Sequence, residues 1–173
     1  MKKFCFLLII FCVLSIFCSC SVHTTSVDEA LIRIHIRANS NCATDQAVKM
    51  AVKSEITAYL ERELKGVNDY ATAYREIEKR LDRLSSIASD ALKENGFSYK
   101  AKAVMNNEYF PTRAYKDSVV PSGYYDALIV TLGEGEGDNW WCVVYPPLCF
   151  TGANGNYIYK SKIREIIENF KNG

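Results

Sequence analysis

Apolar residues recur with two different periods along the chain. In residues 30–37 they alternate with polar ones, and Ile32, Ile34 and Ile36 share one side, which predicts a strand with one buried face. From Thr44 the apolar period becomes four residues. This pattern predicts an amphipathic helix with Thr44 as its N-cap that ends at Gly66. The helical stripe consists of Val48, Val52, Ile56, Leu60 and Leu64.

A second helix is predicted from residue 69 to residue 94, because the apolar stripe continues until Asn95-Gly96 supplies a stop. The period then returns to two. The predicted strands are 97–105, 109–115, 124–132 and 140–145, with a hairpin turn at Asn106-Asn107 and a flexible loop over 133–138. A last helix is predicted over 160–170.

The element order β-α-α-β-β-β-β-α predicts an α+β fold. We expect a single domain over residues 29–173, built as a mainly antiparallel sheet with helices packed on one face. The chain of 173 residues, 49% of them hydrophobic, is long enough for one such domain with a buried core.

The N-terminus has the pattern of a secretory leader. Lys2 and Lys3 precede an almost wholly apolar run, residues 4–18. We interpret residues 1–20 as a signal peptide or N-terminal anchor and residues 21–28 as a short tether. Three fates of the leader stay open, namely cleavage, retention as an anchor, and acylation at Cys20. In each case the body of the protein is expected outside the cytoplasm.

Charge and metal-ligand spacing exclude several classes of partner. Lys plus Arg number 21 and Asp plus Glu 20, so the basic excess of a nucleic-acid-binding protein is missing. No Cys/His spacing supports a zinc site. Glu134, Glu136 and Asp138 lie in a glycine-rich loop, but the later Glu of an EF-hand is absent. We therefore expect neither a metal nor another cofactor.

Three cysteines remain beyond the leader: Cys42, Cys142 and Cys149. If the chain folds back between Tyr145 and Pro146, position 142 faces position 149, at a separation that a disulfide can bridge. The sequence therefore predicts a Cys142–Cys149 disulfide in an oxidising compartment. The alternative is that both are buried as small apolar residues.

Two short segments offer candidate binding residues. Trp140 and Trp141 are adjacent on a predicted strand, so they face opposite sides, and an exposed tryptophan is a common interface anchor. Phe110-Pro111-Thr112-Arg113 combines a fixed backbone with a fork-shaped cation. Arg113 either binds a partner carboxylate or pairs with a local Asp; both interpretations stay open.

Five blocks of sequence resemble a known family. They are residues 37–40, 45–49, 110–115, 121–128 and 133–150, of which the last is long and unusual. In these blocks the chain resembles the stage II sporulation protein R family of endospore-forming bacteria.

The resemblance implies a secreted signalling protein rather than an enzyme. Members of the family pass from the forespore into the space between the two septal membranes. There they activate a membrane-embedded aspartyl protease of the mother cell, which processes the precursor of sigma factor E. The expected partner is therefore that protease, with membrane contact only through the leader or at the septal surface. The candidate partner-binding residues are Phe110, Pro111, Thr112, Arg113, Trp140 and Trp141.

Two other functions compete with this one. The first is a cysteine-dependent cell-wall hydrolase in which Cys142 is the nucleophile, His35 the base and Asn39 the orienting group, because a thiol needs a base beside it. The second is a wall-binding module that uses exposed aromatic residues.

Overall fold

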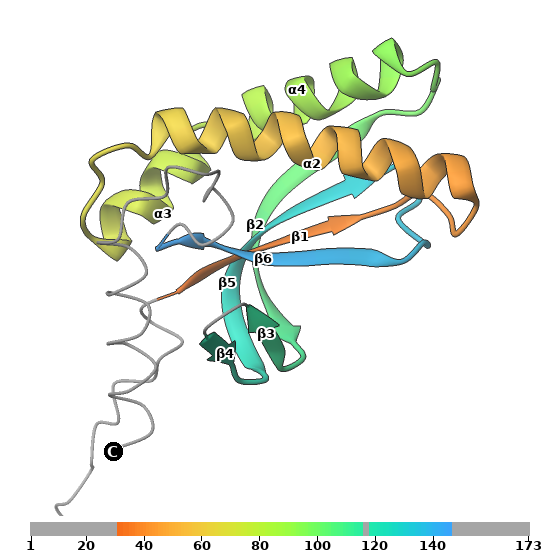
Figure 1. Ribbon diagram of the computed structural model, residues 1–173. Helices are drawn as coiled ribbons and strands as arrows, with labels where there is room; N and C mark the ends of the chain where they lie inside the picture. The colour runs from red at the N-terminus through yellow and green to blue at the C-terminus, as the bar shows by residue number, and fades with distance from the viewer. Residues whose placement is uncertain (1–30, 116–117, 147–173) are drawn as a thin grey trace, which may run out of the picture.

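The computed structural model describes residues 31–115 and 118–146, which form three helices and six strands (Figure 1). In chain order the elements are β1 (Ile32–Arg37), α2 (Ala43–Glu63), α3 (Tyr70–Glu78), α4 (Leu81–Glu94), β2 (Ala101–Phe110), β3 (Arg113–Tyr115), β4 (Ser118–Val120), β5 (Gly123–Leu132) and β6 (Asn139–Tyr145). The predicted leader, tether and last helix lie outside the described residues.

Four strands form one sheet in the order β2-β5-β1-β6. The pairs β2–β5 and β1–β6 are antiparallel, whereas β1 and β5 run parallel. The short strands β3 and β4 pair only with each other. The predicted α+β class and the helix layer on one face are confirmed, and the sheet is mixed because the long β2–β5 hairpin places β5 beside β1 (Figure 1).

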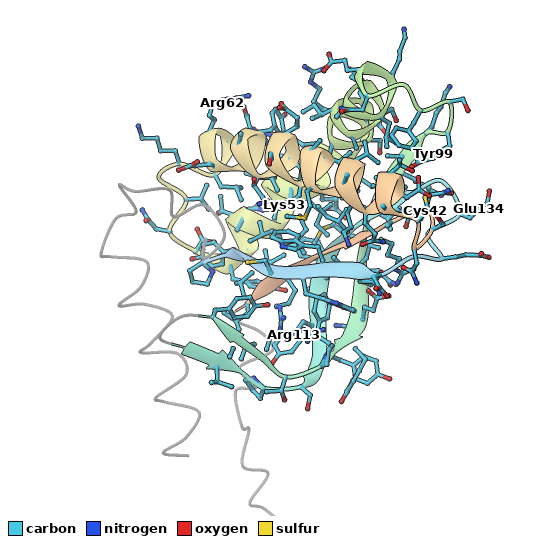
Figure 2. All side chains as sticks on the ribbon, turned by 45° about the vertical axis from the view of Figure 1, so that its right-hand side comes forward. Cys42, Lys53, Arg62, Tyr99, Arg113 and Glu134 are labelled. Atoms are coloured by element: carbon cyan, nitrogen blue, oxygen red, sulfur yellow. The ribbon has the colours of Figure 1, made fainter. Side chains whose placement is uncertain are left out.

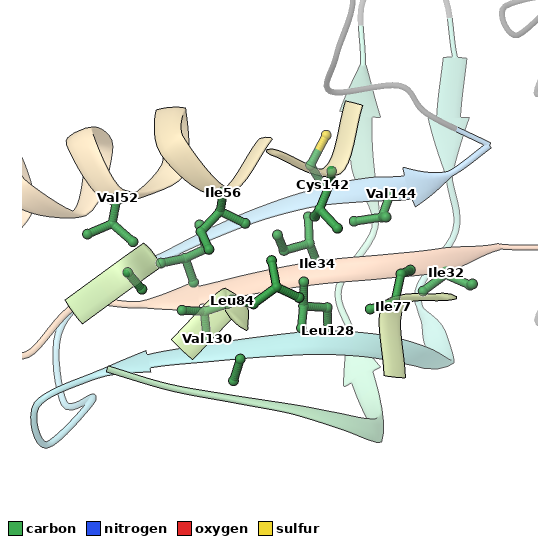
Figure 3. Packing of buried hydrophobic residues seen from close by; sticks show 14 of the residues in the cluster. Ile32, Ile34, Val52, Ile56, Ile77, Leu84, Leu128, Val130, Cys142 and Val144 are labelled. Carbon is green, nitrogen blue, oxygen red and sulfur yellow. The ribbon is translucent and has the colours of Figure 1, made fainter. Parts of the chain in front are cut away.

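The main core lies between the helices and the sheet. Ile32, Ile34 and Ile36 are fully buried on the side of β1 that faces α2. The α2 stripe meets them, and Figure 3 shows Val52 and Ile56 above Ile34. Each such side chain contributes about 1.5–3 kcal/mol when it is fully buried. The four-residue stripe and the alternating strand therefore define the same core, as predicted.

The other face of β1 is also buried, and here the prediction of a single buried face is wrong. Arg33 is 0% exposed and His35 only 2%. They are covered because the chain beyond β2 turns back and the β3–β4 hairpin lies under this side of the sheet (Figure 1). A second apolar cluster forms there from Leu31, Phe110, Val120, Tyr125, Ala127, Ile129 and Val143.

The boundaries of the second helix and of the predicted strands 97–105 and 109–115 differ from the prediction, since β2 spans Ala101–Phe110 and β3 only Arg113–Tyr115. The second helix is divided into α3 and α4 at Lys79 and Arg80. An unbroken helix of that length would extend about 39 Å at 1.5 Å per residue. The break instead lets α3 and α4 take different directions over the sheet (Figure 1). Arg80 supports the break because its Nε donates to the Glu63 carboxylate at 3.0 Å and its Nη1 pairs with Glu76.

The predicted hairpin at Asn106-Asn107 is also wrong, since β2 continues through both residues to Phe110. Asn107 is accommodated in the strand because its amide donates to Asp126 on the paired strand β5, at 3.0 Å. The N-cap of α2 is Cys42 rather than Thr44, which lies inside the helix. None of the helices in the described ranges is long and apolar enough to span a lipid bilayer.

Candidate functional site

Arg33 occupies the centre of the sheet face that lies away from the helices. Its Nε donates to the Cys142 carbonyl oxygen at 3.1 Å, and its Nη2 donates to the Tyr115 hydroxyl at 2.9 Å. The guanidinium carbon lies 4.5 Å from the ring centroid of Phe110 and 5.1 Å from that of Tyr125. Arg33 is thus held by one carbonyl, one phenol and surrounding aromatic rings.

No carboxylate among the described residues pairs with Arg33, and its Nη1 makes no hydrogen bond there. Burial lowers the pKa of Arg33, and the nearby Arg113 lowers it further, while Tyr115 acts in the opposite direction. A buried cation is normally paired, because desolvation penalises an unpaired charge. Arg33 departs from that rule.

His35 lies beside Arg33 on the same face of β1. Its Nδ1 is 2.7 Å from the Glu108 carboxylate, which also pairs with Arg37. Burial is the main influence on the pKa of His35 and lowers it, against the opposing effects of Glu108 and Asn139. The imidazole is therefore neutral at pH 7, so Nδ1–H donates to Glu108. Nε2 is buried and makes no hydrogen bond of normal geometry among the described residues, although the Asn139 side chain is near enough to act on the pKa.

Trp141 connects this buried layer to the surface. Its ring stacks on His35 at a centroid distance of 3.7 Å and meets Phe110 edge to face at 4.8 Å. The Arg113 guanidinium lies 5.9 Å from the centroid of the Trp141 ring, and Arg113 is exposed. Figure 2 shows Arg113 on the side of β6 away from α2. We call Arg33, Phe110, Arg113, Tyr115 and Trp141 the arginine face.

The structure separates the six predicted partner-binding residues. Thr112 is exposed beside Arg113, and its hydroxyl accepts the Ser122 N–H at 3.0 Å. Pro111 is half-buried. Phe110 is 0% exposed, so its side chain supports the face from below instead of contributing surface.

Trp140 points to the opposite side of the sheet from Trp141, as the alternation of a strand predicts. It packs against the helix-side core, and the Lys53 ammonium of α2 lies 5.6 Å from its ring centroid. Trp140 and Arg113 therefore do not belong to one surface.

The predicted Cys142–His35 dyad is contradicted by the strand register. In the β1–β6 pair Cys142 is opposite Ile34, whereas His35 is opposite Trp141. Cys142 consequently faces the helix-side core, where Figure 3 shows it beside Ile34 and Val144, and His35 faces the other way. A nucleophile and its base must be in contact. The hydrolase that depends on this pair has no assembled site.

The predicted orienting residue, Asn39, belongs to a separate polar cluster that sequence reasoning missed. Its Nδ2 donates to Asp45 at 2.8 Å, and the same buried carboxylate accepts the Ser40 hydroxyl at 2.6 Å and the Tyr99 hydroxyl at 2.6 Å. The hydrogen bond from Ser40, followed by that from Tyr99, lowers the pKa of Asp45 to about 2. We call Asn39, Ser40, Asp45 and Tyr99 the Asp45 clasp.

The clasp also holds the glycine-rich loop 133–138. The Asn39 side-chain oxygen accepts the N–H of Glu134 at 3.0 Å, and the Ala38 carbonyl accepts that of Gly137 at 2.9 Å. A Cβ on Gly137 would lie 2.2 Å from the Ser40 carbonyl oxygen. The loop that the sequence predicted to be flexible is therefore tied to the end of β1, and glycine permits this close approach.

Two further predictions concern the disulfide and metal binding. Cys149 lies outside them, so the Cys142–Cys149 disulfide stays a prediction. Within the described ranges no three His, Cys, Asp or Glu side chains form a group suited to a metal ion. Cys42 is exposed at the start of α2.

The geometry defines a class of protein: a small α+β domain whose sheet face away from α2, α3 and α4 presents Arg113 on Trp141, with the buried Arg33 below them. The family model described as "Stage II sporulation protein R (spore_II_R)" matches residues 28–155, and the chain belongs to this family. A role in sporulation follows from that membership.

The chain is 31% identical over 140 residues to Stage II sporulation protein R of Bacillus subtilis (strain 168). The alignment covers 80% of this chain and 62% of that relative, so the chain spans less than two thirds of the relative's length. No solved structure matches the chain.

Proposed function

We propose that the chain is an exported signalling protein of sporulation that acts by docking on a protein partner. The partner is a membrane-embedded aspartyl protease of the mother cell, which the signal activates to process the sigma factor E precursor. The site of action is the space between forespore and mother cell. Family membership supports this proposal, together with the secretory pattern that begins at Lys2 and Lys3.

The observation that carries the docking surface is the exposed Arg113 held over Trp141. Tryptophan and arginine are the residue types most enriched among the energetically dominant positions of interfaces. Trp141 is already fixed by His35 and Phe110, so little side-chain freedom is lost on docking. The surface comprises Thr112, Arg113 and Trp141.

Activation by docking has a defined energetic requirement. The ligand must bind the active form of the protease more tightly than the inactive form. A shift of the inactive-to-active equilibrium from 99:1 to 1:99 requires about 5.5 kcal/mol of differential binding. Three anchor residues at about 2 kcal/mol each reach that scale.

The test is co-expression of the chain with the candidate protease and its sigma-factor precursor. Processing of the precursor is expected only when the chain is present. Arg113→Ala and Trp141→Ala should be exported normally and should fail to trigger processing. Arg83→Ala removes another exposed arginine, on α4, and should leave processing unchanged. Normal processing with both surface variants excludes this surface, and no processing with the wild-type chain rejects the function.

A wall-binding module remains a second candidate because of one specific observation. Tyr109 and Tyr124 are 53% and 63% exposed, and their rings lie edge to face at a centroid distance of 5.6 Å. Sedimentation with purified sacculi tests this function. Binding that is lost in Tyr109→Ala and Tyr124→Ala supports the wall-binding module, and a chain that stays in the supernatant rejects it.

A further inference from the structure

We propose that Arg113, with the buried Arg33 behind it, forms a receptor for a carboxylate on an acidic segment of the protein partner. The inference deepens the proposed function and rests on it for the identity of the partner. Carboxylate binding itself is a property of this chain and is measurable without the protease.

The charges on this face do not balance. Among the described residues its cations are Arg33, Arg37 and Arg113, with Lys102 further along β2, and its carboxylate is Glu108, which is already engaged by Arg37 and hydrogen-bonded to His35. Arg33 and Arg113 have no acidic partner among the described residues. Two neighbouring guanidinium groups repel each other, and an anion beside them relieves that repulsion.

The burial of Arg33 adds to this excess of positive charge among the described residues. Arg33 is 0% exposed, and its Nη1 has no hydrogen-bond partner within residues 31–115 and 118–146. Leaving a buried donor unpaired costs about 1–3 kcal/mol, and more when the group is charged. Tyr115 and Phe110 hold Arg33 in place despite this cost.

The two arginines have different roles in the receptor. Arg113 is exposed and contacts the carboxylate, while Arg33 contributes its positive potential from within the fold. Because Arg33 lies in a medium of low dielectric constant, its charge is screened less than a surface charge would be. The partner therefore benefits from Arg33 without touching it.

The geometry favours a protein carboxylate over an anionic membrane. Polybasic membrane-binding segments use clusters of about 4–8 lysines and arginines. Among the described residues, this face exposes two cations that no ion pair engages, Arg113 and, at the far end of β2, Lys102. Arg33 is buried and Arg37 is paired with Glu108, so the face has fewer exposed cations than a polybasic segment uses. A guanidinium resting on the Trp141 ring presents a planar fork that matches one carboxylate in bidentate fashion.

The test follows the indole N–H signals of the two tryptophans in the isotope-labelled full chain, purified in a non-ionic detergent. The probe is an acetylated tetra-aspartate peptide, and tetra-asparagine and tetra-lysine peptides are the controls. The Trp141 signal should shift saturably with tetra-aspartate alone. The Trp140 signal, which comes from the opposite face, should stay in place and serves as an internal control. Added salt should weaken the binding.

Variants separate the receptor from general charge effects. Arg113→Gln should weaken tetra-aspartate binding at least about tenfold, which corresponds to about 1.4 kcal/mol. Arg113→Lys should retain part of the affinity. Arg83→Gln, on exposed α4, should bind like the wild type. Arg33→Met, with an unchanged Trp140 signal as the check of folding, should weaken binding less than Arg113→Gln does.

The inference is overturned if tetra-aspartate leaves the Trp141 signal unmoved, or if Arg113→Gln binds it as tightly as the wild type. It is also overturned if the signal moves only with vesicles that contain phosphatidylglycerol, because the site then serves a membrane. A different result would reject the proposed function and leave carboxylate binding intact. In that case tetra-aspartate binds as expected, but the sigma-factor precursor is not processed in the co-expression assay.

Discussion

The Asp45 clasp and the arginine face both lie within residues 28–155, which the family model matches, and their surroundings act on buried charge in opposite ways. The clasp surrounds one carboxylate with three hydrogen-bond donors, from Asn39, Ser40 and Tyr99. The arginine face surrounds one guanidinium with aromatic rings, and one of its nitrogens has no hydrogen-bond partner in the part of the chain that the structure describes. Figure 2 shows them apart, with Tyr99 near the start of α2 and Arg113 across β6.

The two environments shift the pKa values of Asp45 and Arg33 for different reasons. Hydrogen bonds lower the pKa of Asp45 to about 2, so its environment favours the charged form. Burial lowers the pKa of Arg33, so its environment disfavours the charged form. A region whose polar groups are satisfied internally holds the fold together, whereas a region with unpaired charge is suited to an external partner. A region within the part of the chain that matches the family can therefore either stabilise the fold or bind a partner.

The largest expected effect on folding is that of Asp45→Ala. The change leaves three donors without an acceptor in a buried site, and we expect the free energy of unfolding to fall by about 3 kcal/mol. Asp90→Ala removes the same side chain from an exposed position of α4 and should change it by less than about 0.5 kcal/mol. Urea denaturation followed by circular dichroism measures both. Equal midpoints for the two variants would show that the clasp does not stabilise the fold.

Gly137→Ala tests the same region through packing. The new methyl group would meet the Ser40 carbonyl oxygen at 2.2 Å and the Ala38 Cβ at 3.0 Å, and overpacking of this kind costs about 1–3 kcal/mol. Gly66→Ala is the matched control, because no atom lies within 4 Å of its Cβ position, although its φ of +81° carries its own strain. We expect the lower urea midpoint for Gly137→Ala. A midpoint for Gly137→Ala equal to that of the wild type would mean that loop 133–138 is not held tightly.

Much of the fold was predictable because a period in the sequence directly encodes a buried face. The α2 stripe from Val48 to Leu60 and the strands β5 and β6 were found in this way. Alternation likewise placed Trp140 and Trp141 on opposite sides. These features depend only on neighbouring residues, so the sequence contains the necessary information.

The parts that were not predictable depend on contacts between distant segments. Arg33 and His35 look like solvent-facing residues of a half-buried strand, and only the fold-back after β2 covers them. Strand register keeps Cys142 and His35 on opposite faces of the sheet. A shift of one residue in the pairing of two strands moves every side chain to the other face, so the sequence alone does not show which face a residue takes. The approach of Arg113 to Trp141 likewise arises between segments remote in sequence.

A change in pH should have a smaller effect on stability, and this effect should differ between the arginine face and the Asp45 clasp. Burial holds the pKa of His35 below its ordinary value of 6.5, so the folded state disfavours the protonated imidazole. The stability that neutral His35 contributes is present above pH 6.5 and is lost as the pH falls through the folded-state value. Asp45 keeps its charge down to about pH 2, so the clasp should withstand the same acidification.

Hydrogen exchange measured above and below pH 6.5, corrected for the intrinsic pH dependence of exchange, reports this contrast. Backbone amides around Trp141 should lose protection at the lower pH, while the amides of Glu134 and Gly137 keep theirs. His35→Phe preserves a ring against Trp141 and cannot take up a proton, so its protection should not respond to pH. The same loss of protection in His35→Phe as in the wild type would remove His35 as the cause.

Arg113→Ala should have the smallest effect on folding and completes the comparison. The exposed cation over Trp141 is worth about 0.5–1 kcal/mol, so the urea midpoint should barely move. Processing of the sigma-factor precursor should nevertheless be lost, because the proposed docking contact is removed. Asp45→Ala should behave in the opposite way, with processing reduced only in proportion to the folded fraction. If Arg113→Ala instead lowers the urea midpoint as much as Asp45→Ala does, the arginine face is a second stabilising cluster, and its unpaired charge has no bearing on a partner.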